Sequence, residues 1–120
     1  MKYLVDTNII IYHLAGEQKA TDFIAQYLHE IAISFISYIE ILSYPFDKKQ
    51  EEDIRKFLEK IHMITISKEI IEEAIRLRKE KKNKLPDCII AASASVKKLT
   101  LVTRNLKDFN SLDLTIHNPF

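Results

Sequence analysis

Short apolar runs alternate with longer segments of helical periodicity along the whole chain, and this alternation constrains the fold more than any other feature. The apolar runs cover residues 2–5, 31–35, 63–66, 99–103 and 114–117. Apolar side chains recur at helical spacing in residues 9–14, 18–30, 37–44, 48–61, 68–82 and from Pro86 onward. Strands that alternate with helices favour an α/β fold with a mainly parallel sheet. We therefore predict a single domain of this class over residues 1–120.

The composition excludes several classes of protein. With one glycine, Gly16, the chain has no glycine-rich phosphate loop of the P-loop or Rossmann kind. The single cysteine, Cys88, excludes an internal disulfide, and the four histidines lack the paired spacing of a zinc site. No stretch approaches the roughly 20 apolar residues of a membrane span. Asp6 and Asn8 interrupt the first apolar run, unlike a signal peptide, so we expect a cytoplasmic protein.

Three acidic residues lie within or beside apolar segments, where a lone carboxylate is costly. Asp6 follows the first apolar run, Glu40 lies within residues 36–42, and Asp87 precedes residues 88–92. A buried carboxylate without a partner is strongly destabilising. Three of them therefore indicate convergence on a divalent metal, a bound Lys or Arg, or a shared proton. Ligand sites of parallel sheets lie beyond the C-terminal strand ends, where we expect Asp6 and the turn at 103–105.

Two of the acids have a structural interpretation that competes with a functional one. Asp6 could cap the helix that starts at residues 6–8. Asp87 follows Pro86 at another helix start, where the helix dipole would stabilise it. Small residues on the same stripe, such as Ala91 and Ala94, should let this helix approach the sheet and bring Asp87 toward Asp6.

The remaining polar positions are Glu40, Asn105 and Asp108. Apolar neighbours surround Glu40, so we expect a helix that is buried nearly all round and a functional carboxylate. Asn105 either caps a turn to which Asp108 bonds back, or serves as a ligand, and both interpretations stay open. Oxygen ligands without a His/Cys set indicate Mg²⁺ or Mn²⁺, which could activate water and stabilise charge on a phosphodiester.

Four short motifs, in this order, resemble those of PIN-domain ribonucleases, and in particular VapC toxins of bacterial or archaeal toxin–antitoxin pairs. The motifs are residues 4–8, 34–42, 87–92 and 101–109. The resemblance implies a three-layer α/β/α fold with a mainly parallel sheet of about four to five strands. It also implies endonucleolytic RNA cleavage at an acidic Mg²⁺ or Mn²⁺ site, a homodimer, and inhibition by a VapB-like antitoxin.

The resemblance assigns roles by position. Asp6, Glu40 and Asp87 would be the catalytic acids that hold the metal. Asn105 stands where the family often has a fourth acid, which leaves Asp108 as an alternative for that position and puts a second metal in doubt. The supporting positions are Thr7, Asn8, Thr103 and Asp108.

Basic residues crowd the segment before Asp87, although the net charge is only +1. Such a run is usually a solvated helix face, but beside an acidic metal site it could hold RNA phosphates. Both interpretations stay open. The residues considered for RNA contact are Arg78, Lys81, Lys82, Lys84 and Arg104.

The predicted function is a metal-dependent endoribonuclease that acts as the toxin of a toxin–antitoxin pair and hydrolyses RNA with a metal-activated water. One alternative is an aspartyl-phosphate phosphatase or receiver-like protein with Asp6 as nucleophile. Such a phosphatase would require a second Asp where this chain has Asn8. Another alternative is a non-catalytic PIN-like module that binds RNA or a partner, against which the retention of three acids argues.

Overall fold

The computed structural model describes residues 1–81, 83–109 and 112–120. Its sheet has five strands in the order β3-β2-β1-β4-β5, and all neighbouring strands pair in parallel. The strands are β1 (Tyr3–Val5), β2 (Ile31–Ser34), β3 (His62–Ile64), β4 (Thr100–Val102) and β5 (Ile116–His117). The predicted parallel sheet is confirmed.

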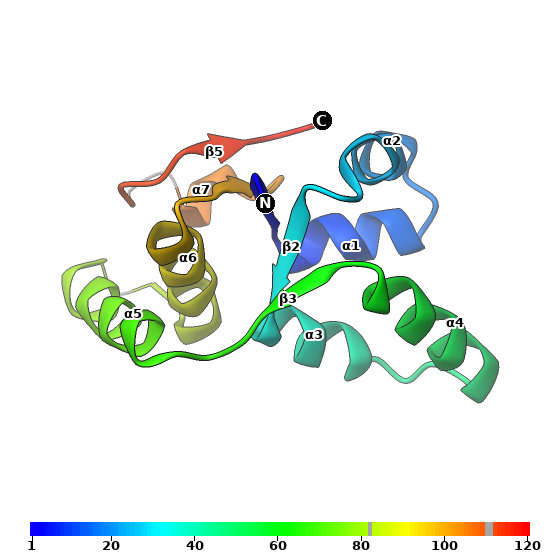
Figure 1. The fold of residues 1–120 in the computed structure, drawn as a ribbon, viewed down its shortest axis with the longest axis horizontal. Helices are drawn as coiled ribbons and strands as arrows, with labels where there is room; N and C mark the ends of the chain where they lie inside the picture. Colours follow the sequence, from blue (N-terminus) through cyan, green and yellow to red (C-terminus); the bar gives the residue numbers. More distant parts are fainter. Residues whose placement is uncertain (82, 110–111) are drawn as a thin grey trace.

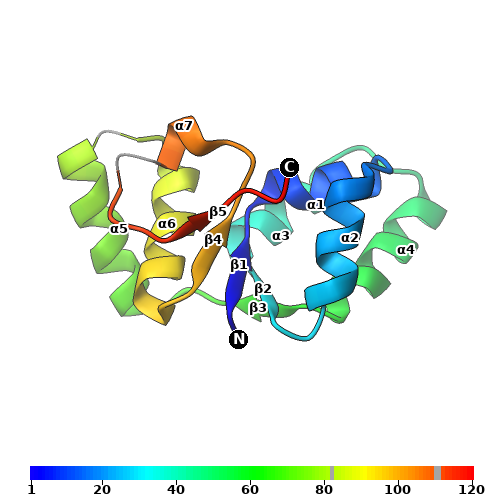
Figure 2. The same ribbon diagram turned by 90° about the horizontal axis from the view of Figure 1, so that it is seen from above.

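Helices cover both faces of this sheet. They are α1 (Thr7–Leu14), α2 (Gln18–Tyr27), α3 (Phe35–Leu42), α4 (Lys48–Glu59), α5 (Lys68–Lys81), α6 (Leu85–Lys97) and α7 (Leu106–Phe109). Figures 1 and 2 show α5 and α6 on one side of the strands and α1 and α2 on the other. The three-layer α/β/α arrangement is therefore confirmed.

The pleat of the strands divides their side chains between two cores. Leu4 and Leu101 pack in the cluster formed with α5 and α6, whereas Val5 and Val102 pack in the cluster formed with α1, α2 and α4. All four side chains are fully buried, as expected for strands covered on both faces. The small residues of α6, including Ala91, are also fully buried, so this helix packs closely on the sheet.

Several predicted boundaries shift for local reasons. Ser34 ends β2 because its hydroxyl accepts a 3.2 Å hydrogen bond from the Ile36 amide, so α3 begins earlier than the expected residue 37. The expectation that this helix is buried nearly all round is wrong, because Ile39 is 56% exposed. The helix predicted over residues 68–82 is α5, and its predicted last residue, 82, lies outside the described residues.

Within the described part of the chain, no helix is both long and apolar enough to cross a bilayer. The cytoplasmic location stays a prediction.

Candidate active site

The C-terminal edge of the sheet carries a cleft with a volume of about 370 Å³. Asp6 comes directly after β1, Glu40 lies on the helix that follows β2, and Asp87 lies in the first turn of α6. The cleft is lined by Asp6, Thr7, Asn8, Ile11, Tyr12, Glu40, Tyr44, Asp87, Ile90 and Asn105. Four predicted site residues far apart in sequence, Asp6, Glu40, Asp87 and Asn105, thus share one cavity.

Asp6 is the most deeply buried of these acids, with 6% of its surface exposed. Its Oδ1 accepts a 2.8 Å hydrogen bond from the Thr7 amide, so it does cap α1. Its Oδ2 accepts a second bond of 2.8 Å from the Thr103 hydroxyl. Burial foremost, with repulsion from Asp87 and Glu40, raises the pKa of Asp6 to about 6 despite these two bonds. The capping and site interpretations of Asp6 therefore hold together.

Glu40 is fixed from the side of α1. The Thr7 hydroxyl donates to Glu40 Oε1 over 2.7 Å and lies 2.8 Å from the Ser37 hydroxyl. Because a hydroxyl has one proton, Thr7 donates its hydrogen bond to the carboxylate and accepts one from the Ser37 hydroxyl. Thr7 thereby connects the first turn of α1 to α3, which positions Glu40 relative to Asp6.

Asp87 is half-buried in the first turn of α6. Burial is the largest cause that raises its pKa, followed by repulsion from Asp108, with a smaller contribution from Glu40. Lys84 opposes this shift. Among the described residues no hydrogen bond fixes the Asp87 carboxylate, so it is the freest of the three acids.

Asn105 lines the cleft and pairs with Asp108, which is not among the lining residues. The backbone N–H of Asn105 donates a 3.0 Å hydrogen bond to Thr103 Oγ1, and the side-chain Nδ2 of Asn105 donates to Asp108 Oδ2. Asn83 Nδ2 holds the Asp108 backbone carbonyl over 2.6 Å. The predicted contact between residues 105 and 108 is thus made between their side chains, and the Asp108 charge acts on Asp87.

Asn8 carries a buried oxygen whose hydrogen-bonding capacity is unused. Its Nδ2 donates to Thr103 Oγ1 over 3.4 Å, while Oδ1 has no hydrogen-bond partner among the described residues. An unsatisfied buried acceptor of this kind costs about 1–3 kcal/mol. Because Asn8 lines the cleft, this oxygen is suited to hold a water or a hydrated cation there.

The donor set of the cleft fits a hard divalent cation. It consists of carboxylate and amide oxygens, the ligands of Mg²⁺ and Mn²⁺. In the described ranges, no three acidic, His or Cys side chains are grouped closely enough to hold an ion by themselves. Mg²⁺ commonly keeps several waters and takes one or two carboxylates, which agrees with acids spread around a cleft.

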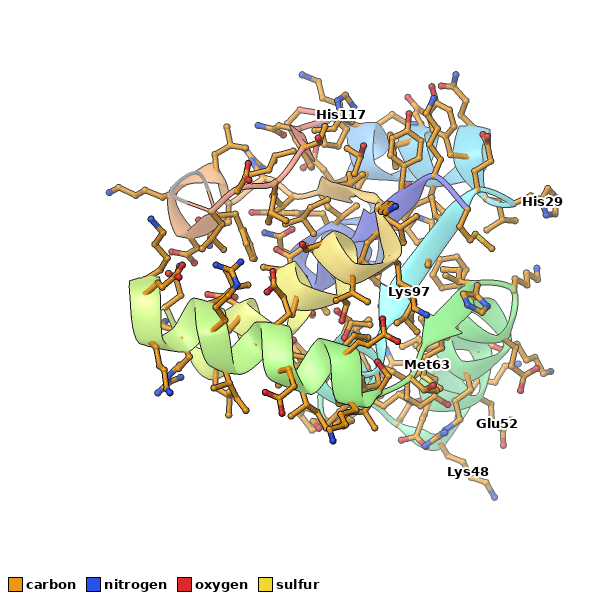
Figure 3. The ribbon with its side chains drawn as sticks, turned by 60° about the vertical axis from the view of Figure 1, so that its left-hand side comes forward. His29, Lys48, Glu52, Met63, Lys97 and His117 are labelled. Atoms are coloured by element: carbon orange, nitrogen blue, oxygen red, sulfur yellow. The ribbon has the colours of Figure 1, made fainter. Side chains whose placement is uncertain are left out.

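The histidines take no part in this cleft. His13 lies 2.9 Å from the Thr21 hydroxyl and packs on Phe57, away from the cleft lining. Figure 3 shows His29 projecting outward at the turn before β2, with His117 on β5. The donor chemistry of the site is accordingly that of oxygen.

The basic residues considered for RNA contact divide into two groups. Lys84 acts on Asp87, and the Arg104 guanidinium lies over the ring of Tyr12, which lines the cleft. Arg78 and Lys81 are exposed in the last turn of α5. Lys82 lies outside the described residues.

Ser37 and Tyr12 contribute polar groups to the site, although neither was predicted as a site residue. Ser37 stands three positions before Glu40 on the same helix, and Tyr12 stands four positions after Asn8. Residues at these spacings share a helix face, so the signal was present. It points to a functional residue only when the facing element is known.

Comparisons with known proteins agree with this geometry. The family model described as PIN domain matches residues 3–113. A chain of a toxin–antitoxin complex from Klebsiella pneumoniae is 36% identical, with coverage of 99% of this chain and 98% of that chain and a TM-score of 0.90. VapBC2 from Rickettsia felis, bound to a DNA fragment from its promoter, gives 27% identity, 98% coverage of both chains and a TM-score of 0.85.

The DNA-bound VapBC from Salmonella typhimurium is similar at 18% identity, with coverage of 100% of this chain and 99% of that chain and a TM-score of 0.89, which shows a shared fold. No curated protein sequence matches the chain. The family model spans most of the chain, and the Klebsiella relative aligns over nearly the full length of both chains. The chain therefore belongs to the PIN domain family, as a VapC-type member.

Proposed function

We propose that the protein is a metal-dependent endoribonuclease and the toxin of a toxin–antitoxin pair. The observation that carries this proposal is the convergence of Asp6, Glu40 and Asp87 on one cleft at the C-terminal edge of the sheet. Carboxylates crowd together against their own repulsion where they serve a cation or a proton transfer. The similarity to chains of toxin–antitoxin complexes supports the toxin role.

Asp6, Glu40 and Asp87 would hold one Mg²⁺ or Mn²⁺ ion together with its bound waters, because the three carboxylates are not grouped closely enough to hold it by themselves. When bound, the ion would supply positive charge that stabilises the phosphodiester in the transition state and makes a water more acidic. The unpartnered Oδ1 of Asn8 supports this assignment, because it can accept a hydrogen bond from a water of the ion's shell. Asn105, or Asp108 held by it, occupies the fourth position.

The residues of the chain divide the remaining work. Thr103 and the Thr7 amide fix both oxygens of Asp6, and the Thr7 hydroxyl fixes one oxygen of Glu40. These two carboxylates are therefore rigid ligands. Asp87 is free of such bonds among the described residues, so we assign to it the orientation and deprotonation of the attacking water.

The partners we propose are RNA as substrate, a VapB-like antitoxin, and a second copy of this chain. An apolar cleft of about 140 Å³ runs between α5 and α6. It is lined by Phe35, Ile66, Ile70, Ile71, Ala74, Ile75, Leu85 and Ile89. Exposed side chains such as Leu85, at 53%, make this face suited to a two-fold homodimer interface.

Tyr44, 49% exposed beside Glu40, offers the antitoxin an apolar contact at the acidic cleft.

One experiment separates this function from the alternatives. Purified protein is incubated with labelled RNA with and without Mn²⁺, and in parallel with a labelled phosphoryl donor. Cleavage that requires Mn²⁺ supports the nuclease. Transfer of label to Asp6 without RNA cleavage would support the hypothesis of an aspartyl-phosphate phosphatase or receiver-like protein. RNA binding without either reaction would leave a non-catalytic binding module.

A further inference from the structure

The guanidinium group of Arg104 lies against two aromatic rings at the rim of the acidic cleft. Its Cζ is 5.1 Å from the centroid of the Tyr12 ring and 4.3 Å from that of the Phe120 ring. The two ring centroids are 5.2 Å apart, with the planes tilted by 60°. Rings on opposite faces of the guanidinium would be much farther apart than this. Both rings therefore lie on one side of the guanidinium and do not enclose it. Arg104 remains exposed to solvent.

These three residues, the Arg104 cluster, adjoin the acids directly. Tyr12 lines the same cleft as Asp6 and Asp87. Arg104 follows Thr103, whose hydroxyl holds Asp6, and precedes Asn105, which also lines the cleft. The cation therefore lies beside the cleft, just after the C-terminal end of β4.

The acids do not neutralise this cation. The pKa of Asp6 is raised by burial and by other carboxylates, and the positive group that acts on Asp87 is Lys84. The salt bridges found among the described residues join other pairs, and none includes Arg104. The rings hold the guanidinium by cation–π attraction and leave its N–H donors available.

We propose that the Arg104 cluster binds an unpaired nucleotide of single-stranded RNA next to the scissile phosphate. The N–H edge of Arg104 binds a backbone phosphate, and the open face of the guanidinium stacks on the adjoining base. A cleft of carboxylates repels a polyanion, so a cation held beside the cleft offsets part of that repulsion. This inference rests on the proposed ribonuclease function and extends it to the form of the strand.

The preference for single-stranded over duplex RNA follows from the geometry of base stacking. Bases in a duplex are already stacked on one another, and side chains cannot insert between them without unpairing them. A single strand presents free base faces, for which aromatic and guanidinium platforms are suited. The Arg104 cluster should therefore contribute to binding of a single strand and little to binding of a duplex.

The test measures fluorescence anisotropy of a short labelled RNA, alone and annealed to its complement, with the full chain in Ca²⁺, under which turnover is slow. Arg104→Gln should weaken single-strand binding about 10-fold and reduce the slope of log affinity against log salt by about one. Phe120→Leu should weaken it about threefold through lost stacking support, while Arg104→Lys should fall between wild type and Arg104→Gln.

Arg55→Gln provides the matched control. Arg55 is an exposed arginine on α4 that pairs with Glu51, so its loss removes the same charge elsewhere on the surface. It should change single-strand affinity by less than about twofold. Equal losses in Arg55→Gln and Arg104→Gln, or equal losses on single strand and duplex, would reduce the effect to general charge and overturn the proposal.

The outcomes also separate this inference from the function itself. If wild type cleaves RNA with Mn²⁺ but Arg104→Gln binds a single strand normally, the proposal for the Arg104 cluster is overturned and the nuclease function stands. If wild type does not cleave RNA but its binding of a single strand depends on Arg104, the nuclease function is overturned and the Arg104 cluster remains an RNA-binding site. Thermal unfolding checks each fold, and if Arg104→Gln does not fold, Phe120→Leu and Arg104→Lys decide the result.

Discussion

The hydroxyl of Thr103 donates a 2.8 Å hydrogen bond to Oδ2 of Asp6 across 97 positions of sequence. Parallel pairing of β1 with β4 makes this contact, because Val5 and Val102 are register partners and the next residue of each strand leaves the sheet at the same edge. The bond is buried, and it orients the most enclosed carboxylate of the cleft. The sheet register itself therefore assembles this part of the site.

Thr103→Val should destabilise the fold and weaken metal binding together. The substitution keeps the shape and removes the donor, so Asp6 Oδ2 loses its partner at a cost of about 1–3 kcal/mol. The pKa of Asp6 should rise further, which favours the proton over the metal. Denaturant unfolding and Mn²⁺ calorimetry measure both effects. Thr100→Val on the same strand is the control, and an equal loss there would assign the effect to strand packing.

Asp6→Asn should stabilise the metal-free protein in a way that depends on pH. The folded-state pKa of about 6 exceeds the ordinary 3.8, so folding loses stability as pH rises through this window. Asparagine cannot ionise, so its advantage over wild type should grow between about pH 4 and pH 6 and reach about 3 kcal/mol at most. Denaturation of both proteins in EDTA measures the difference. A difference that stays constant with pH would contradict the assignment.

Wild type should bind Mn²⁺ more tightly as pH rises through about 6, because the ion must displace the proton that Asp6 retains below that value. Calorimetry in buffers of different ionisation enthalpy measures the affinity and the protons released. Affinity that does not change over this range would mean that Asp6 is no ligand.

The order of strands and helices could be predicted from the chain, because apolar periodicity is a property of neighbouring residues. Helix α7 was missed, since its four residues are too few to display a period. The exposure of Ile39 was also missed, because the burial of an apolar side chain depends on which element covers it. Local pattern therefore determined type and order of elements, and tertiary packing determined burial.

The candidate site was predictable in its residue types and less so in its contacts. Acids in apolar surroundings marked Asp6, Glu40 and Asp87, because such positions are costly without a purpose. The bond from Thr103 to Asp6 depends on the β1–β4 pairing, which periodicity does not reveal. The stacking of Arg104 on Phe120 likewise depends on where the chain returns after β5.

Asn105→Asp should tighten binding of divalent cations, because it adds an anionic ligand at the cleft. Asn105→Ala should reduce activity less than Asp87→Asn, since Asn105 orients Asp108 and carries no charge. Cleavage rates and calorimetry measure both. If Asp108→Ala proves more damaging than either change at 105, Asp108 is the fourth acid and the assignment of Asn105 fails.

Ile75→Glu combined with Leu85→Glu should convert a homodimer into a monomer. Both side chains line the apolar cleft between α5 and α6 and are 44% and 53% exposed. A buried unpaired charge in an interface is strongly unfavourable. Light scattering measures the mass, with Met63→Glu on β3 (labelled in Figure 3) as the control. Monomeric wild type at about tens of micromolar would argue against this interface.

Cleavage of a labelled RNA by wild type and Asp87→Asn, before and after EDTA, is the most direct test of metal-dependent hydrolysis at the acidic cleft. We predict that cleavage by wild type stops in EDTA and returns with Mn²⁺ or Mg²⁺, and that a correctly folded Asp87→Asn loses at least about 100-fold in cleavage rate. Cleavage that persists in EDTA and leaves 2′,3′-cyclic phosphate ends would contradict it, because the RNA 2′-hydroxyl would then be the nucleophile.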